Sequence, residues 1–326
     1  MKVVVDALGG DNAPQVVLDG LAQALASEPQ LEVLLTGPDD VVKGAARAYP
    51  QRVTAVATSE FISMQEHPAE AVRQKKDSSI VVGCRLVAEG QADGFYSAGS
   101  TGAVMTAATL VMGRIRGISR PVLVTMLPTA SGYVVFGDVG ANADCKPEYL
   151  LQFALMQQAY ATNVLKIAKP RIGLLNIGEE NTKGSELAQQ SFQLLQDNLE
   201  NFVGNAEGHD ISSGRFDCIV TDGFTGNVVL KTIEGTAALL LNEFKAVLTA
   251  NTVSKLAASV VKPGLKNLSK RLSSDEVGGA PLLGVRGSCF IGHGSASALS
   301  ICNGILATAR AIQSDLVATI TQSVAN

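Results

Sequence analysis

The 326-residue sequence predicts an α/β protein with a doubly wound, mostly parallel β-sheet. The first observation is that short β-branched runs alternate with segments of helical apolar periodicity along most of the chain. The second is that polar loops containing glycine follow several of these runs, in a chain that holds 32 glycines. Ligands of doubly wound sheets bind outside the carboxyl ends of the strands, so these loops are the candidate site.

The strand and helix signals can be placed along the chain in order. Nine segments have the strand pattern: Lys2–Ala7, Leu31–Thr36, Arg52–Val56, Gly94–Ser97, Val122–Leu127, Val134–Asp138, Arg171–Asn176, Cys218–Thr221 and Ser288–Ile291. Helices are expected at Pro14–Ser27, Ser78–Glu89, Thr101–Met112, Pro147–Ala161, Lys183–Gln196 and Ala296–Ile312. Pro14 and Pro147 suit the first turn of a helix, and Ser78 suits an N-cap.

One long segment carries helix signal without a strand. We expect two helices there, Thr225–Thr249 and Thr252–Leu272, as a protruding helical-hairpin insertion at about 225–275 within a single domain of residues 1–326. The second helix has no acidic residue among its basic ones, which are Lys255, Lys262, Lys266, Lys270 and Arg271. This pattern fits an ordinary bundle helix with a solvated face, and it also fits a helix that contacts a membrane surface or an acidic partner.

Composition limits the class of protein. Hydrophobic residues make up 46% of the chain, enough for a large core, while charged residues make up 17% and the net charge is -4, which argues against nucleic-acid binding. The five cysteines are scattered and never spaced as Cys-x-x-Cys, which favours free thiols in a reducing cytoplasm over a disulfide framework. The N-terminus lacks the apolar stretch of a signal peptide, and no run of about 18 apolar residues predicts a membrane span.

Six loops combine polar residues with glycine at the end of an expected strand. They are Asp6–Asn12, Ser97–Gly102, Asp138–Lys146, Asn176–Gly184, Asp222–Asn227 and Gly292–Ser295. Glycine-rich turns and helix N-termini present backbone N–H groups that bind anions. Each loop by itself also fits a structural turn or a helix cap.

Some side chains in these loops are not explained by capping alone. The Asp138–Lys146 loop crowds two carboxylates, an amide and a lysine into nine residues. Lys183 stands at the expected start of a helix, where a cation is unfavourable unless an anion lies between it and the helix; a solvated loop lysine is the alternative. His293, between two glycines after the last strand, is a better catalytic candidate than His67 or His209.

Several chemistries are excluded by spacing. The three histidines are too far apart in sequence for a metal-ligand motif, so no metal is expected. The chain has no G-x-S-x-G nucleophile elbow, no Walker A sequence and no G-x-G-x-x-G fingerprint. Spacing therefore indicates an α/β enzyme with an anionic, phosphate-bearing ligand and goes no further.

Taken together and in order, the loops resemble those of the acyl-ACP:phosphate acyltransferase (PlsX) family. The matching segments are DALGGD at Asp6–Asp11, PAEA and KKDSS at Pro68–Ala71 and Lys75–Ser79, SAGSTGA at Ser97–Ala103, DVGANADCKPE at Asp138–Glu148, NIGEE with KG at Asn176–Gly184, DGFTGNVVLK at Asp222–Lys231, and LLG with HG at Leu282–Gly294. The chain departs from the family pattern at Asn12, Ser100, Ala296 and Ser297, where His, Asn, Ser and Asp are usual.

The resemblance implies transfer of a long-chain acyl group from acyl carrier protein to inorganic phosphate in bacterial phospholipid synthesis. It also implies a fold like that of isocitrate and isopropylmalate dehydrogenases, a homodimer, a cytoplasmic location with peripheral membrane contact, and no cofactor. Phosphate is already anionic near neutral pH and a thiolate leaves readily, so the reaction needs positioning and oxyanion stabilisation more than an activated nucleophile.

On this basis we expect roles for particular residues. A phosphate cradle is expected from Gly9, Gly10, Ser97, Gly99, Ser100, Thr101 and Gly102, with Lys183 pairing with phosphate charge. Donors to substrate or oxyanion are expected to be Asn142, Asn176, Asn227 and His293, oriented by Asp6, Asp138 and Asp222. Lys75 and Lys76 are candidates for contact with the acidic carrier protein, and the basic residues of the second long helix are candidates for membrane contact.

Three other functions compete with this interpretation. A short-chain phosphate acetyltransferase acting on acetyl-CoA would share the fold class and a phosphate loop. A nicotinamide-dependent β-decarboxylating dehydrogenase would share the fold, but the spacing of its metal carboxylates is missing. A non-catalytic scaffold at the membrane surface would bind liposomes without turnover.

Overall fold

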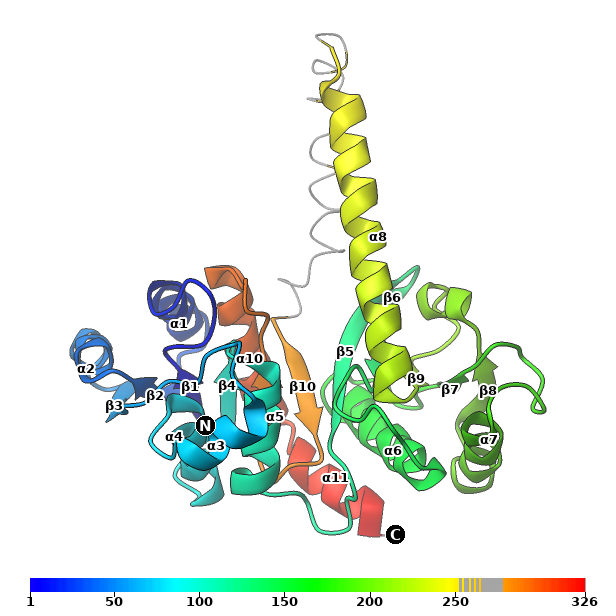
Figure 1. The fold of residues 1–326 in the computed structure, drawn as a ribbon, viewed down its shortest axis with the longest axis horizontal. Coiled ribbons are helices and arrows are strands. Elements are labelled where there is room, and N and C mark those ends of the chain that lie inside the picture. The colour runs from blue at the N-terminus through cyan, green and yellow to red at the C-terminus, as the bar shows by residue number, and fades with distance from the viewer. Residues whose placement is uncertain (252–253, 255–257, 259–260, 262–263, 265–277, 326) are drawn as a thin grey trace.

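The computed structural model describes residues 1–251, 254, 258, 261, 264 and 278–325. Within these residues, one 11-stranded sheet runs through the molecule in the order β3-β2-β1-β4-β11-β10-β5-β6-β9-β7-β8, with helices on both faces (Figure 1). The strands are β1 Lys2–Asp6, β2 Glu32–Gly37, β3 Val53–Ala57, β4 Gly94–Ser97, β5 Val122–Thr129, β6 Gly132–Gly137, β7 Ile172–Leu175, β8 Phe202–Ala206, β9 Cys218–Val220, β10 Ala280–Leu283 and β11 Ser288–Ile291.

The helices connect and cover these strands. They are α1 Gln15–Ser27, α2 Asp39–Ala48, α3 Pro68–Gln74, α4 Ser79–Ala88, α5 Thr101–Ala107, α6 Pro147–Asn163, α7 Glu186–Asn198, α8 Gly223–Thr249, α10 Ala298–Gln313 and α11 Leu316–Ala325. A π-helical turn, η1 Ala108–Met112, continues α5, and a 3₁₀ turn, η2 Gly208–Ser212, follows β8.

The direction of the strands reverses near the middle of the sheet. β1, β2, β3, β4 and β11 are mutually parallel, and β6, β9, β7 and β8 form a second parallel set. Between the two sets, β10 pairs antiparallel with both β11 and β5, and β5 pairs antiparallel with β6. The sheet is therefore mostly parallel, as predicted, but the two parallel sets run in opposite directions.

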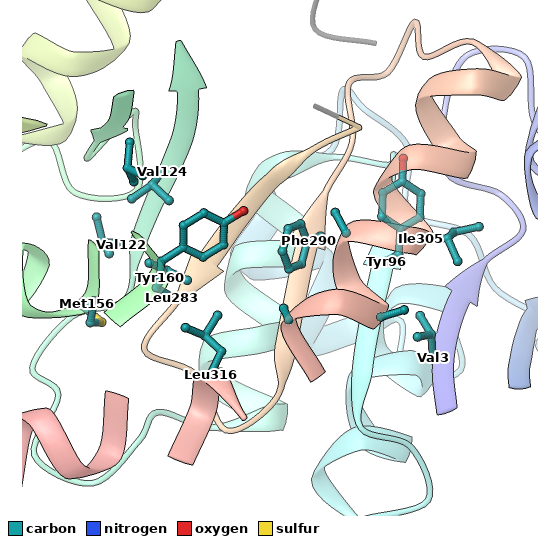
Figure 2. Packing of buried hydrophobic residues seen from close by; sticks show 14 of the residues in the cluster. Val3, Tyr96, Val122, Val124, Met156, Tyr160, Leu283, Phe290, Ile305 and Leu316 are labelled. Carbon is teal, nitrogen blue, oxygen red and sulfur yellow. The ribbon is translucent and has the colours of Figure 1, made fainter. Parts of the chain in front are cut away.

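The strands are buried on both faces, so alternate residues feed two hydrophobic clusters. Val3 and Val5 of β1 belong to one cluster and Val4 to the other. In the first cluster, Tyr96 and Phe290 from neighbouring strands lie beside residues of α10 and α11 (Figure 2). Such double-sided burial explains why the strands have nearly continuous apolar runs.

Helices α1 and α10 pack tightly on the first cluster because Gly20 lets them approach. A Cβ on Gly20 would lie 2.7 Å from both the Ala298 carbonyl oxygen and Ile301 Cγ2. This close contact joins the first helix of the chain to one near its end, which also contacts β11 and β4.

Helix α8 extends far beyond the sheet (Figure 1). Only Gly223 and Gly226, at its start, are buried, while apolar side chains along its outer part are at least half exposed: Leu239, Leu240, Phe244 and Val247. None of the described helices combines the length and the apolar character needed to cross a membrane. The first of the two predicted long helices is therefore confirmed, whereas the second lies largely outside the described residues.

The nine predicted strands all occur, with ends within two residues of the prediction. Ser78 and Pro147 occupy the predicted N-cap and first-turn positions, and all five cysteines are free. Several helix starts differ from the prediction. α7 begins at Glu186, not Lys183, because Ser185 is the N-cap and accepts a hydrogen bond from the Ala188 N–H at 3.3 Å. α10 begins at Ala298, not Ala296, after its N-cap Ser297, and Pro14 is the N-cap of α1 and not part of its first turn. The predicted helix Thr101–Met112 is α-helical only to Ala107 and then becomes the π-helical turn.

An ion pair joins the amino ends of β7 and β9. Arg171 donates to Asp217 from its backbone N–H at 2.8 Å and from Nε at 2.9 Å, both to Oδ2, and from Nη2 to Oδ1 at 3.0 Å. Burial tends to raise the pKa of Asp217, but the Arg171 hydrogen bonds outweigh it, so this pKa lies below its ordinary value.

Replacing Asp217 with asparagine is expected to lower the free energy of unfolding by about 1–2 kcal/mol near neutral pH. The pKa of Asp217 is lower in the folded state than in the unfolded state, where it is about 3.9. The contribution is therefore present above about pH 4 and is lost as the pH falls through the folded-state pKa. Urea unfolding of wild type and D217N at neutral pH and well below pH 4 measures this difference. The control is Asp197→Asn, at an exposed position of α7. A difference in unfolding free energy that does not change with pH would contradict the prediction.

Candidate active site

Three of the six predicted loops meet because their strands, β1, β4 and β11, are neighbours in the sheet. The Gly292 N–H donates to the Ser97 carbonyl at 2.9 Å, and the Asp11 N–H donates to the Gly294 carbonyl at 2.7 Å. Gly9 lies so close to the Ser97–Gly102 loop that a Cβ there would be 2.7 Å from the Ala98 nitrogen. We call the loops Asp6–Asn12, Ser97–Gly102 and Gly292–Ser295 the first loop group.

Asp6 and Ser97 are buried and hold the first loop group together by hydrogen bonds. Asp6 is buried, and it accepts hydrogen bonds from the Leu8 N–H at 3.0 Å and from the Ser97 hydroxyl at 2.7 Å. Ser97 Oγ in turn accepts from the Gly99 N–H at 3.0 Å. Burial raises the pKa of Asp6, partly opposed by hydroxyl and N–H donors. Asp6 and Ser97 therefore shape the loops and do not face solvent.

The start of α5 is the part of the first loop group that can meet a ligand. Ser100 is the N-cap, and its hydroxyl accepts weakly from the Ala103 N–H at 3.4 Å. Thr101 is exposed at the first helical position, followed by Gly102. N–H groups in a first helical turn have no partner within the helix. Hydroxyls and N–H groups thus converge at this point, without a lysine or arginine in the three loops.

The loops after β6 and β9 form a second loop group, Asp138–Lys146 with Asp222–Asn227. Asp138 is fully buried and accepts from the backbone N–H groups of Gly140, Ala141 and Asn142 at 3.2, 3.0 and 2.7 Å. Both amide hydrogens of Asn142 are also used, because Nδ2 donates to Asp138 and to the Pro121 carbonyl, each at 2.8 Å. Asn142 is therefore committed to the loop and has only its Oδ1 free for a substrate.

The Asp222–Asn227 loop is pinned to the Asp138–Lys146 loop at the start of α8. The Gly223 N–H donates to the Asn142 carbonyl at 2.8 Å, and Asp222 caps α8 by accepting from the Thr225 N–H at 2.8 Å. Asn227 is exposed, and its side chain has no hydrogen bond to any described residue. Burial raises the pKa of the nearby Cys145 thiol to about 12, which makes it a poor nucleophile.

Gly226 is required where α8 crosses the Asp138–Lys146 loop. A Cβ on Gly226 would overlap the Asp138 carbonyl oxygen and lie 2.9 Å from Thr221 Cγ2. We expect G226A to lower the free energy of unfolding by about 1–3 kcal/mol, because α8 would have to move off the loop. The matched control is G235A on the same helix, where nothing lies within 4 Å of the added carbon. Equal stability of both variants in urea unfolding would contradict this.

The fourth predicted loop, Asn176–Gly184, leaves the same edge of the sheet as the second loop group, because β7 pairs parallel with β9. Asn176 shapes it by donating from Nδ2 to the Lys183 carbonyl at 3.1 Å and accepting from the Ile177 N–H at 2.8 Å. Asn205 of β8 donates to the Glu180 carbonyl at 2.9 Å. Lys183 itself is exposed, and its amine has no partner among the described residues.

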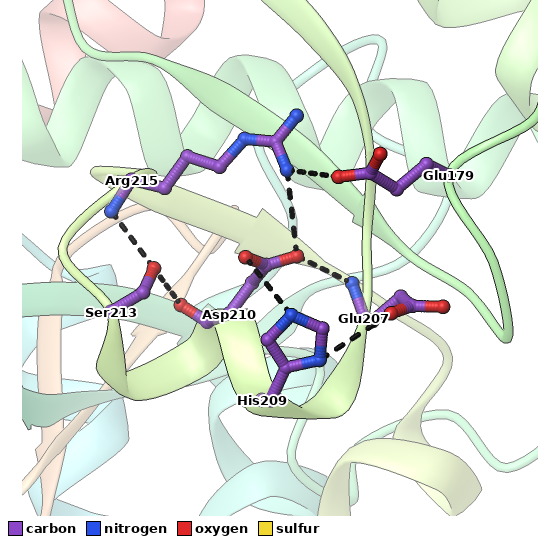
Figure 3. Close-up of polar contacts among 6 residues, drawn as sticks. All are labelled: Glu179, Glu207, His209, Asp210, Ser213 and Arg215. Atoms are coloured by element: carbon purple, nitrogen blue, oxygen red, sulfur yellow. Dashed lines mark hydrogen bonds and ion pairs between the residues drawn. The ribbon is translucent and has the colours of Figure 1, made fainter.

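A polar cluster beside this loop holds it to the turn η2. Arg215 pairs with Glu179 of the loop and lies 3.8 Å from Asp210, and His209 lies between Glu207 and Asp210 (Figure 3). Sequence reasoning did not find this cluster, because its members are spread over 37 residues on two connections. The Arg215–Glu179 pair is largely exposed, so its effect on stability is small and its role is to hold the loop in place.

The strand order separates the fourth loop from the first loop group. Along the sheet β4 and β7 are six inter-strand spacings apart, each about 4.8 Å, and they run in opposite directions. Within one chain, the structure therefore does not bring Lys183 next to Ser100 and Thr101. By contrast, α5 and the first turns of α8 pack on the same hydrophobic cluster, on either side of β10 and β5 (Figure 1).

The two lysines that were predicted to contact the carrier protein have different surroundings. Lys75 is half-buried, paired with Glu66 at 2.6 Å and bonded to the Phe61 carbonyl at 2.6 Å, whereas Lys76 is exposed and bonded to the Val72 carbonyl at 3.3 Å. The predicted membrane-contact residues, Lys255, Lys262, Lys266, Lys270 and Arg271, lie outside the described residues. In the described part of the chain, no group of three or more His, Cys, Asp and Glu side chains could hold a metal ion.

Comparisons with known proteins agree with this architecture. A family model described as fatty acid synthesis protein matches residues 1–319. A phosphate acyltransferase of Desulfitobacterium hafniense is 48% identical over 97% of this chain and 96% of its own length, and one of Anoxybacillus flavithermus is 44% identical over 100% and 99%.

Solved structures show the same fold at low sequence identity. A phosphotransacetylase from Streptococcus pyogenes covers 100% of this chain and 94% of its own, with a TM-score of 0.60 and 17% identity. A branched-chain phosphotransacylase from Enterococcus faecalis covers 96% and 99%, with a TM-score of 0.58 and 15% identity. Fold and loops thus define an α/β acyltransferase. The chain belongs to the fatty acid synthesis protein family, here the PlsX family, whose curated relatives are phosphate acyltransferases.

Proposed function

We propose that this phosphate acyltransferase takes a long-chain acyl group from acyl carrier protein and releases acyl-phosphate for bacterial phospholipid synthesis. The observation that carries the proposal is the first loop group, in which three loops joined by backbone hydrogen bonds carry hydroxyls, glycines, His293 and the free N–H groups at the start of α5. A thioester donor and a phosphate acceptor need such donors for the phosphate oxygens and for the carbonyl oxygen.

The chemical step balances without a cofactor. An oxygen of hydrogen phosphate attacks the thioester carbonyl carbon, and the carbonyl oxygen becomes a tetrahedral oxyanion. The C–S bond then breaks, the carbonyl re-forms as acyl-phosphate, and the phosphate proton ends on the carrier thiol. Ser100, Thr101 and Gly102 would hold the phosphate, and an N–H donor from His293 would stabilise the oxyanion.

Lys183 has a different place in this proposal from the one the sequence indicated. The loop that carries it leaves the sheet six strands away from β4, so Lys183 would not touch a phosphate held by Ser100 and Thr101 of its own chain. Its exposed, unpaired amine is instead available to an acidic partner such as the carrier protein, as is the exposed Lys76.

The exposed apolar side of α8 supports the expected homodimer and peripheral membrane contact. Leu239, Leu240, Phe244 and Val247 are 50–66% exposed on this one helix, which is unusual for side chains that remain in water. Free cysteines agree with a cytoplasmic location.

A direct assay tests the donor. The purified protein is incubated with phosphate and palmitoyl-ACP, and free carrier protein and acyl-phosphate are followed by mass spectrometry. Phosphate-dependent release of both products supports the proposal. Activity with acetyl-CoA and none with palmitoyl-ACP would identify a short-chain phosphate acetyltransferase instead, the alternative that the phosphotransacetylase-like fold favours.

A further inference from the structure

His293 and Ser295 are joined by two contacts within the loop that follows β11. The backbone N–H of Ser295 donates to Nδ1 of His293 at 3.3 Å, and the Ser295 hydroxyl lies 2.8 Å from the same nitrogen. No other described residue makes a hydrogen bond or ion pair with the imidazole, so Nε2 has no partner among the described residues, and the side chain is exposed. One nitrogen of the ring is therefore occupied and the other is available.

Backbone hydrogen bonds hold the loop that carries His293 and Ser295. The Ala296 N–H donates to the His293 carbonyl at 2.9 Å, and the Asp11 N–H donates to the Gly294 carbonyl at 2.7 Å. Gly294 is also close to Met64 and Asp11, because a Cβ there would lie 3.0 Å from Met64 Cε and 3.4 Å from Asp11 Oδ1. The imidazole thus stands on a loop that is tied to the first loop group.

The contacts at Nδ1 decide which nitrogen carries the proton of the neutral ring. A backbone N–H can only donate, so the nitrogen that receives it must offer a lone pair. In neutral histidine one nitrogen is an acceptor and the other a donor, so Nε2 carries the proton. The Ser295 hydroxyl, which can rotate, then donates to Nδ1 as well.

We propose that Ser295 is a positioning residue that holds neutral His293 as the Nε2–H tautomer, so that Nε2 donates a hydrogen bond to the thioester carbonyl oxygen. The contact with the thioester carbonyl rests on the proposed function, whereas the tautomer of His293 does not. A neutral donor suits this site, because it stabilises the growing oxyanion without losing a proton to the incoming phosphate. No basic residue in the first loop group can take over this task.

The tautomer is measured without turnover. The protein is labelled with ¹⁵N-histidine, and the two-bond proton–nitrogen spectrum is recorded at mildly alkaline pH; the chain has three histidines, and the His293 signals are those lost in H293A. We expect wild-type His293 to show an unprotonated Nδ1 and a protonated Nε2. S295A loses the hydroxyl contact but keeps the backbone N–H at 3.3 Å, so the Nε2–H form should remain the larger while the Nδ1–H form becomes detectable. S295T, which keeps the hydroxyl, should restore the single form.

Kinetics complete the test. S295A is expected to lower kcat roughly tenfold with little change in the KM for phosphate, less than the roughly 10²–10³-fold that loss of an oxyanion donor costs. S295T should recover most of the rate. The control is S297A, which removes the N-cap of α10 two residues away and should reduce stability without changing the tautomer.

The two possible failures are distinct. A protonated Nδ1 in wild type, or an unchanged tautomer in S295A, overturns the role of Ser295 whatever the enzyme does. A confirmed tautomer with unchanged kcat in both S295A and H293A overturns the role of His293 in the proposed reaction and leaves the positioning intact.

Discussion

Replacing Asp138 with alanine is expected to lower the free energy of unfolding by roughly 3–5 kcal/mol. The Asp138 carboxylate accepts from four backbone N–H groups, including that of Leu123 at 3.3 Å, and from Asn142 Nδ2. Burial raises the pKa of Asp138, which means that its ionised form is costly to bury. The hydrogen bonds offset this cost, and alanine would leave several donors without an acceptor.

The measurement is urea unfolding of D138A beside a matched variant. Asp144 lies in the same loop but is exposed, and it makes no hydrogen bond to the described residues, so D144A should unfold with wild type. D138N should lie between them, because its amide keeps one acceptor oxygen but sets its NH₂ against the donors of Asn142. If D138A unfolded at the same urea concentration as the wild type, the buried hydrogen bonds around Asp138 would contribute nothing to stability.

The elements that were predicted are those whose signal is local. Buried parallel strands such as Gly94–Ser97 and Ser288–Ile291 have apolar runs of strand length between glycine and polar residues, and both bounds were correct. β10 was missed because its four residues, Ala280–Leu283, include Pro281, which weakens any strand pattern. β8 was missed because Gly204 and Asn205 interrupt its apolar run.

The reversal of strand direction comes from the hairpin of β5 and β6, because β10 pairs antiparallel with both β11 and β5 and so leaves those two strands parallel to each other. The sequence analysis placed Val122–Leu127 and Val134–Asp138 in one mostly parallel series, in which the six loops would lie at one edge of the sheet. Because β6 instead pairs antiparallel with β5, β9 and β7 run in the reversed direction as well. The loops that carry Ser100 and Lys183, both expected around phosphate, therefore leave opposite edges of the sheet.

The candidate site shows the same division between local and distant information. The polar residues and glycines of each loop were visible in the sequence, but the sequence does not show which polar side chains shape the loops and which are left for a substrate. The hydrogen bonds of Asp6, Ser97 and Asn142 show that these side chains shape the loops. Thr101 and His293 remain available for a substrate, a distinction that only the contacts reveal.

His293→Ala is therefore the substitution expected to affect the reaction most. We expect kcat with acyl-ACP to fall about 10²–10³-fold, the range found when one oxyanion donor is removed, while the KM for phosphate changes little. Stability should remain close to that of the wild type, because the His293 side chain is exposed and, among the described residues, is hydrogen-bonded only to Ser295.

The matched variant for this test is His209→Ala. His209 is also exposed, but it lies in the polar cluster beside η2, away from the first loop group, so H209A should keep its full rate. H293Q distinguishes a hydrogen-bond donor from a proton-transfer group, because its amide can donate but cannot shuttle a proton. A substantial rate in H293Q would favour the donor role, and equal rates for H293A and wild type would remove His293 from the reaction. An oxyanion donor would then have to come from the backbone N–H groups at the start of α5, which only a proline substitution removes.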